Sequence, residues 1–224
     1  MTATLTATSN PYLDHYREAL AHQQAHNSRY LWENQPHDSC FECLKAGQHD
    51  LGWHGIKRRY AWAIPNDAAL RTIADHAPVV EIGAGGGYWA GLLRARSVDV
   101  LAYDIDPDGG PDPDGHPGWH DGRRWSQVLP GDHTAVQQHP DRTLLLIWPS
   151  YNEPWTDQVL DLYTGDTVIY VGEGPGGCTG TDRMHDLLGQ TGEGDARFAE
   201  VAEVDIPQWA GLHDRLTVHQ RIRG

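Results

Sequence analysis

Residues 79–89 read Val-Val-Glu-Ile-Gly-Ala-Gly-Gly-Gly-Tyr-Trp, a short apolar run followed by a glycine-rich turn. The β-branched residues of the run predict a strand, and the glycines end it. Residues 88–96 continue with apolar side chains spaced three and four positions apart, which predicts a helix. Glycines let the backbone turn sharply and let a ligand approach more closely than any Cβ would allow. The segment therefore predicts a strand, a ligand-binding turn and a helix.

Two common nucleotide-binding motifs do not fit this turn. The dinucleotide fingerprint Gly-x-Gly-x-x-Gly requires a third glycine where Tyr88 stands, and an ATP-binding P-loop requires Gly-Lys-Ser/Thr, which does not follow. A flexible turn or another α/β nucleotide-binding fold remains open from the glycines alone.

The rest of the chain alternates between strand-like and helix-like segments. Further strands are predicted at 98–103, 125–129, 143–148 and 167–171, and helices near 133–138, 155–163 and 181–189. The two final strands, 197–206 and 214–222, have no helix between them, so we expect an antiparallel hairpin. This order predicts an α/β fold with a doubly wound, mostly parallel sheet that binds ligands at the carboxyl ends of its strands.

The N-terminal part has a different pattern. Residues 11–26 predict a helix, and residues 34–55 are interrupted by Pro, Gly, Cys and His. A second helix is expected after Ile64-Pro65-Asn66, because Pro and Asn favour helix starts. We interpret 1–63 as a helical lid that covers the substrate and 64–224 as the α/β domain.

The order Glu81-x-Gly83-x-Gly85-x-Gly87 between a strand and a helix resembles motif I of the class I S-adenosylmethionine (SAM)-dependent methyltransferases. The resemblance covers about residues 65–224 and implies a Rossmann-like, seven-stranded sheet with one antiparallel strand. Asp104 ends the second strand, where the acidic residue of this family binds both ribose hydroxyls, and a carboxylate suits two donors. The cofactor-binding residues that the resemblance implies are Glu81, Gly83, Ala84, Gly85, Gly87, Tyr88, Trp89, Asp104, Ile105, Asp132 and Trp148.

Two of these positions follow later strands. Asp132 resembles the residue that contacts the adenine edge. Trp148 begins Trp148-Pro149-Ser150-Tyr151, which resembles the motif IV region facing the transferring methyl group. The Asp/Asn-Pro-Pro-Tyr form of enzymes that methylate base nitrogens is absent, so the side chain that would hold an exocyclic amine is missing.

Composition agrees with a small-molecule substrate. The chain has 17 Lys and Arg against 31 Asp and Glu, a formal charge of −14, whereas nucleic-acid binding relies on clustered basic residues. We therefore expect no nucleic-acid partner. The chain starts without a signal-peptide pattern and has no apolar run of about 20 residues, so we expect a cytoplasmic protein with no membrane partner. Few lysines and many arginines suggest a bacterial, GC-rich genome. The oligomeric state stays open, a homodimer included.

Three residues are candidates for catalysis. Glu173 ends the fifth strand and His120 lies in the long loop after the second, and either is a candidate general base. Tyr151 is a candidate for packing on the methyl group or orienting the acceptor. The alternatives are a surface histidine, since the chain has 14, and an ordinary core aromatic.

A cluster of metal-type ligands occurs at His37, Cys40 and Cys43. A structural zinc site would normally add a second Cys pair, which is missing, so we expect no zinc and partly buried, reduced thiols instead.

These features favour a SAM-dependent methyltransferase, a one-carbon transferase that methylates O or N of a small molecule of the secondary-metabolite type. The alternative is a SAM lyase or cyclase on the same scaffold, which converts SAM intramolecularly and releases methylthioadenosine. A non-catalytic SAM-binding protein is a third reading. The N-terminal aromatic residues leave two options open, an aromatic pocket for a cation or packing of the lid itself; they are Tyr12, Tyr16, Tyr30, Trp32, Tyr60 and Trp62.

Overall fold

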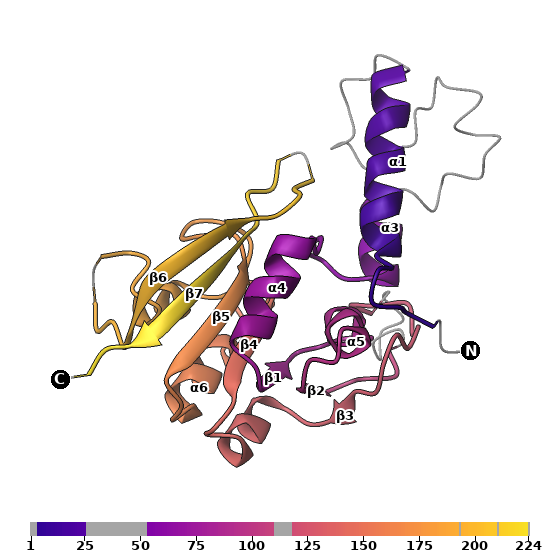
Figure 1. The fold of residues 1–224 in the computed structure, drawn as a ribbon. Coiled ribbons are helices and arrows are strands. Elements are labelled where there is room, and N and C mark those ends of the chain that lie inside the picture. The colour runs from indigo at the N-terminus through magenta and orange to yellow at the C-terminus, as the bar shows by residue number, and fades with distance from the viewer. Residues whose placement is uncertain (1–3, 26–52, 110–117, 193, 210, 224) are drawn as a thin grey trace.

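The computed structural model describes residues 4–25, 53–109, 118–192, 194–209 and 211–223 (Figure 1). Seven strands form one sheet in the order β3-β2-β1-β4-β5-β7-β6. The strands are β1 Val79–Ile82, β2 Val100–Asp104, β3 Leu129–Pro130, β4 Thr143–Ile147, β5 Thr167–Gly172, β6 Phe198–Asp205 and β7 Arg215–Arg221. Pairing is parallel from β3 to β5, and β7 is antiparallel to both β5 and β6. The predicted fold class and its C-terminal hairpin are confirmed.

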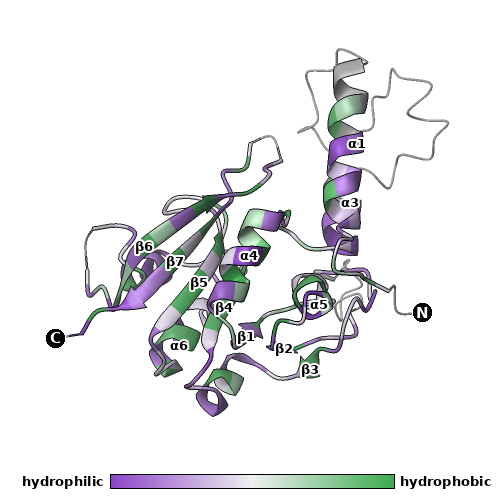
Figure 2. Ribbon diagram, in the orientation of Figure 1, coloured by the Kyte–Doolittle hydropathy of each residue, from purple (hydrophilic) through white to green (hydrophobic). Residues whose placement is uncertain are grey.

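Helices cover both faces of this sheet. The helices α4 Asp67–Asp75 and α5 Tyr88–Ala95 pack on one face, and η2 His133–Gln138, α6 Trp155–Leu162 and α7 Asp182–Leu187 pack on the other. Within β4, Leu145 belongs to the first hydrophobic cluster and Leu144 and Leu146 belong to the second. A strand buried on both faces reads as a continuous apolar run, which is why 143–148 was recognisable (Figure 2).

The N-terminal helices α1 Pro11–Ala25 and α3 Trp53–Arg59 join the first face, and the far end of α1 extends away from the sheet (Figure 1). Tyr12 of α1 is fully buried and stacks on Tyr60 at 5.2 Å between ring centroids. Tyr60 in turn stacks on Trp125 at 5.0 Å. Part of the segment 1–63 is thus integral to the core, and its role as a substrate lid remains a prediction. Helix α3 was not predicted, because Gly55 and the polar residues around it resemble a loop.

One predicted strand is largely wrong, and the end of another has a clear structural cause. The third strand was expected over 125–129, but β3 is only Leu129–Pro130. Trp125 bonds elsewhere: its backbone N–H donates to the Gly86 carbonyl and its indole N–H to the Arg59 carbonyl. Strand β4 ends one residue early, because Trp148 adopts a left-handed backbone with φ of 51°. The other predicted elements are present within two residues of their expected ends.

Among the described helices, none is both long enough and apolar enough to cross a bilayer.

Candidate SAM and acceptor site

The glycine loop, residues 83–87, lies at the carboxyl ends of β1 and β2. The backbone N–H groups of Gly83 and Ala84 both donate to the Tyr103 carbonyl, at 2.9 and 3.0 Å. The N–H of Gly85 donates to Oδ2 of Asp104 at 2.7 Å, and Oδ1 of Asp104 accepts the N–H of Asp106 at 2.8 Å. The loop and the strand-end carboxylate therefore form one hydrogen-bonded unit.

Two glycines of this loop are required for different reasons. Gly87 has φ of 74°, and a Cβ there would lie 2.6 Å from Cγ2 of Val128. Gly85 has φ of 53°, but a Cβ there would meet only the His120 ring, at 3.8 Å. Gly87 thus serves packing, whereas Gly85 leaves space beside the Asp104 carboxylate. Each carboxylate oxygen of Asp104 has a second lone pair with which to accept a hydroxyl, so these residues fit the ribose of SAM.

Ile105 follows Asp104 and is 82% exposed, which is unusual for a large aliphatic side chain at the edge of a buried sheet. An apolar side chain beside the carboxylate that is predicted to bind the ribose suits the face of a purine ring. Asp132 instead caps η2: its Oδ1 accepts the backbone N–H and the hydroxyl of Thr134, at 2.9 and 2.6 Å. Its contact with adenine remains a prediction.

Three other predicted cofactor positions have buried side chains. The Tyr88 hydroxyl donates to Asn10 at 2.9 Å and accepts the N–H of Tyr12, and the Trp89 indole donates to the Ala63 carbonyl. These side chains hold the N-terminal segment, so only their backbone is available to a ligand. Glu81 is 2% exposed, and burial raises its pKa to about 8 despite the nearby Arg94.

An aromatic–lysine cluster stands at the carboxyl end of β4, and it consists of Lys57, Trp62, Trp148 and Asp214. The two indoles stack at 4.8 Å between ring centroids, and Nζ of Lys57 lies 5.1 and 5.0 Å from the centroids of Trp62 and Trp148. The Trp148 indole N–H donates to Asp214 at 2.9 Å. Burial lowers the pKa of Lys57 to about 7 and raises that of Asp214 to about 6.

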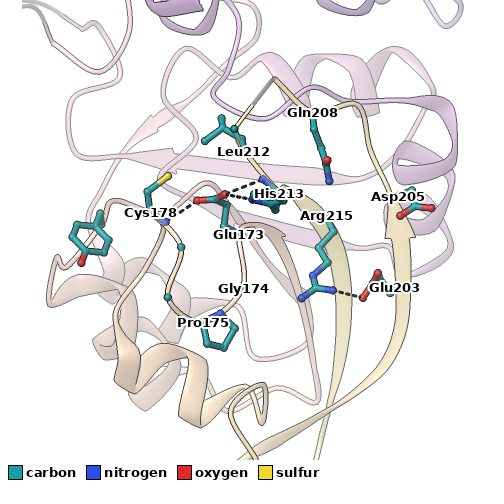
Figure 3. Close-up of a pocket in the computed structure, with 14 residues that line it drawn as sticks. Glu173, Gly174, Pro175, Cys178, Glu203, Asp205, Gln208, Leu212, His213 and Arg215 are labelled. Atoms are coloured by element: carbon teal, nitrogen blue, oxygen red, sulfur yellow. Dashed lines mark hydrogen bonds and ion pairs between the residues drawn. The ribbon is translucent and has the colours of Figure 1, made fainter. Parts of the chain in front are cut away.

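Beside this cluster lies a cavity of about 930 Å³, which we call the Glu173 cavity (Figure 3). It is bounded by Tyr151, by the loop 173–178 after β5 and by residues of the β6–β7 hairpin between 203 and 215. The Glu173 carboxylate lies between two backbone donors, the N–H groups of Cys178 and His213, each at 2.8 Å. Burial opposes its ionisation, but these hydrogen bonds outweigh burial and hold its pKa below the usual value.

The predicted catalytic residues therefore occupy different places. Glu173 is a stabilised anion that ties two loops together. His120 places Nε2 3.0 Å from the Asp106 carbonyl, which requires a protonated Nε2, while Nδ1 accepts the N–H of Gly122 at 3.3 Å. Both ring nitrogens are thus occupied by the backbone. Tyr151 is 65% exposed at the rim of the Glu173 cavity.

Comparisons with known proteins found structural similarities of low TM-score. No family model and no curated protein matches the chain. A crystal structure of a point mutant of MtNAS aligns with 95% of this chain and 76% of its own, at 14% identity and a TM-score of 0.40. An rRNA methylase from Streptococcus thermophilus aligns with 69% of this chain and 93% of its own, at 14% identity and a TM-score of 0.36. The mitomycin 7-O-methyltransferase MmcR aligns with 95% of this chain and 66% of its own, at 13% identity and a TM-score of 0.39.

The strand order decides the fold, since β7 enters antiparallel between β5 and β6 beside a parallel core. This chain has the class I SAM-dependent methyltransferase fold. With TM-scores of 0.36 to 0.40 for the solved structures, this assignment rests on the strand order.

Among the residues that the structure describes, no three His, Cys, Asp or Glu side chains group as a metal site requires. His37, Cys40 and Cys43 lie outside the described residues, as do Tyr30 and Trp32. The expectation that no zinc binds there stays a prediction.

Sequence reasoning missed Lys57, Trp62 and Asp214 as members of one site. The sequence offered one weak signal, the rarity of lysine, since the chain contains only two, but it did not indicate that Lys57 is buried. Nothing local linked positions 57, 148 and 214, because only the sheet order brings them together.

Proposed function

We propose that this chain is an enzyme that binds SAM at the glycine loop and transfers its methyl group to a small molecule. The observation that carries the proposal is the hydrogen bond from the Gly85 backbone N–H to Oδ2 of Asp104, 2.7 Å long, at the carboxyl ends of the parallel strands. A backbone that approaches closely and a carboxylate with spare lone pairs suit the ribose and the methionine portion of SAM.

The acceptor would enter the Glu173 cavity. Its volume of about 930 Å³ lies in the range of small-molecule sites, about 300–1,000 Å³. In the sheet order, β4 separates β1 from β5, so this cavity is next to the glycine loop rather than over it. Donor and acceptor would meet above β4, where Trp148 and Tyr151 begin the connection to α6.

Each predicted catalytic side chain keeps a role that its contacts allow. Tyr151, exposed at the rim, would cover or orient the acceptor. Glu173 would shape the cavity by holding the loops at Cys178 and His213. His120 would support the glycine loop from the side, since its ring lies near Gly85 and Gly109. Neither Glu173 nor His120 is then the proton acceptor.

The second candidate is intramolecular cleavage of SAM with release of methylthioadenosine. The stacked Trp62 and Trp148 favour it, because aromatic faces attract a sulfonium and exclude water from an attacking amine. In this reading the Glu173 cavity would hold the amino-acid portion of SAM instead of an acceptor.

One incubation separates these functions. Purified protein is mixed with SAM alone and then with candidate acceptors, and the products are identified by mass spectrometry. Methyl transfer predicts S-adenosylhomocysteine only when an acceptor is present. Methylthioadenosine from SAM alone would support the second candidate, and tight binding without any product would support a non-catalytic protein. Glu173→Gln and His120→Ala are assayed for turnover and for SAM binding separately; we expect weaker binding of acceptor or SAM in these variants, with turnover that is reduced but not abolished as it would be for loss of a base.

A further inference from the structure

The charges that line the Glu173 cavity are unequal. Three carboxylates, those of Glu173, Glu203 and Asp205, face one guanidinium, that of Arg215. Nη1 of Arg215 and Oε2 of Glu203 form an ion pair at 2.9 Å, so these two charges offset each other (Figure 3). Glu173 and Asp205 then have no lysine or arginine partner among the residues that line the cavity.

The register of the sheet places both of these acids along one edge. Strands β5 and β6 are each antiparallel to β7, so they run in the same direction. Arg215 of β7 pairs with Gly172 of β5 on one side and with Asp205 of β6 on the other. Neighbouring strands are about 4.8 Å apart, so Asp205 stands roughly 10 Å from the end of β5, where Glu173 follows. The two acids therefore flank Arg215 along the wall of the cavity.

The Glu173 carboxylate is kept charged although the residue is only 6% exposed. The backbone N–H groups of Cys178 and His213 hold its pKa below the usual value, which makes it a poor base but a persistent anion. The imidazole of His213 approaches Oε1 at 3.4 Å, and it is exposed to solvent. A carboxylate that stays ionised in a mostly buried position favours a ligand of opposite charge.

The surroundings of Asp205 add no compensating positive charge. Within the described ranges, no hydrogen bond or ion pair involves its carboxylate, and its backbone carbonyl accepts the amide of Asn66 at 2.9 Å. Lys57 and Asp214 do not line the cavity, and each favours the charged form of the other. The whole chain carries −14, which attracts cations from solution.

We propose that the acceptor is an organic cation, in which an ammonium group occupies the Glu173 cavity and a separate O or N atom receives the methyl group. This inference rests on the proposed function. A protonated amine has no lone pair with which to bond the methyl carbon, so the ammonium serves as an anchor. Strands β4 and β5 are neighbours, about 5 Å apart, and a short spacer therefore brings the second group above β4. Phenols, alcohols and second amines that carry an ammonium group belong to this class.

An anionic or zwitterionic acceptor fits the lining less well. Its carboxylate would need Arg215, but Nη1 of Arg215 is held by Glu203 and its Nε is buried. The same carboxylate would also be repelled by Glu173 and Asp205. A neutral acceptor would leave both of these charges without a counter-charge.

The first experiment measures binding without SAM. Four molecules share a phenol ring and differ in the charge of the side chain: tyramine is a cation, 4-ethylphenol is neutral, 3-(4-hydroxyphenyl)propanoate is an anion and tyrosine is a zwitterion. The backbone amides of Cys178 and His213 donate to Glu173, so their ¹⁵N NMR signals report what binds beside it. We expect tyramine to shift both signals and to bind about 10-fold or more tightly than the other three.

Three results of this titration would overturn the inference. One is equal affinity for tyramine and 4-ethylphenol, and another is tighter binding of the propanoate or of tyrosine. The third is the absence of a shift at Cys178 and His213 with both tyramine and putrescine, a cation without a ring.

The second experiment removes one charge at a time. Asp205→Asn should weaken tyramine binding about 3- to 10-fold, because it removes a charge near the ligand, and should leave 4-ethylphenol binding unchanged. The matched control is Glu200→Gln, which lies exposed on the same strand outside the cavity lining and changes the net charge equally. An equal loss in both variants would show that net charge alone attracts the cation, and would overturn the inference.

Glu173→Gln should weaken tyramine binding more than Asp205→Asn does. Glutamine cannot accept from both backbone N–H groups with two oxygens, so this variant is compared only when its melting temperature stays within a few degrees of wild type. Asp205→Asn decides the matter when Glu173→Gln is unstable.

Methyl transfer separates this inference from the proposed function. With SAM present, we expect the KM for tyramine to be about 10-fold or more below that for 4-ethylphenol, at a similar kcat. Equal KM values would overturn the cationic acceptor while supporting methyl transfer. No methylated product from any acceptor, with tyramine still shifting the Cys178 and His213 signals, would contradict the proposed function and leave the preference of the cavity for a cation in place.

Discussion

The glycine loop and the aromatic–lysine cluster lie on the same edge of the sheet but are built in opposite ways. In the glycine loop, Gly85 and Asp104 are 19 positions apart in adjacent strand–turn units, and the bond between them uses a backbone N–H. In the cluster, Trp148 and Asp214 are 66 positions apart, and the bond uses two side chains. Lys57 comes from a third region, the N-terminal segment.

The difference shows how each region can change. The geometry of the glycine loop depends on residues without side chains, so substitution there alters the backbone and the fold with it. The cluster depends on side chains brought in by separate elements. Its chemistry can therefore change while the sheet remains the same. Three variants test this contrast, and a fourth, in the Glu173 cavity, should have the smallest effect.

The largest effect is expected for Gly87→Ala. A Cβ at this left-handed position would lie 2.6 Å from Cγ2 of Val128 and 2.8 Å from Oγ of Ser126. Backbone strain and overpacking together should cost about 3 kcal/mol in the free energy of unfolding. The matched control is Gly176→Ala, which has φ of 82° but no atom within 4 Å, and should cost about 1 kcal/mol. Equal losses in urea unfolding would show that packing at Gly87 is unimportant.

Asp104→Asn should change binding more than stability. The amide preserves the shape but removes the charge and one acceptor, so SAM affinity should fall about 10- to 100-fold in calorimetry. The control is Asp106→Asn, two residues away and exposed, which should bind as wild type does. Unchanged affinity in Asp104→Asn would argue against ribose binding at this carboxylate.

Trp148→Phe tests the cluster and gives a pH dependence. It removes the indole donor to Asp214, and this donor matters most when Asp214 is ionised, above its pKa of about 6. The variant should therefore lose about 1–3 kcal/mol of stability at pH 8 and less at pH 5, where Asp214 is protonated in the folded protein. Trp119→Phe, at an indole that is 64% exposed, should lose little at either pH. An equal loss of stability at pH 5 and pH 8 would mean that the hydrogen bond between Trp148 and Asp214 does not depend on the charge of Asp214.

The smallest effect is expected for His213→Ala. Its side chain is 83% exposed and approaches Glu173 at 3.4 Å, while the stronger contact to Glu173 comes from the His213 backbone N–H. Since alanine keeps that N–H, the loss in thermal or urea unfolding should stay below about 0.5 kcal/mol. A loss above about 1 kcal/mol would show that the exposed ion pair holds the cavity together.

Several features of the fold were predictable because their causes are local. Continuous apolar runs marked β4 and β5, β-branched residues marked β1, and the absence of a helix before the last strand predicted the hairpin. The predicted position of the third strand was wrong, and the reason lies in tertiary contacts that no local sequence pattern shows. Trp125 is apolar enough for a strand, but the rings of Tyr60 and Tyr88 offered it a packing site in the core instead.

The candidate site also has a part that was predictable from the sequence and a part that was not. The glycine loop and Asp104 were predicted by position, and the structure brings them together as one bonded unit. The bases Glu173 and His120 were plausible from their places after strands, but a residue type and a position do not say whether its lone pairs are already used. Hydrogen bonds from Cys178, His213 and Gly122 settle that, and they depend on how the loops close.

The sequence by itself determined the α/β fold, the glycine loop and the strand-end carboxylate, because short-range periodicity and the conformational freedom of glycine act within a few residues. Only the tertiary structure decided that a buried lysine from the N-terminal segment faces two indoles beside Asp214. Burial, and with it the protonation of Lys57, is a property of what surrounds a side chain, and distant parts of the chain supply those surroundings.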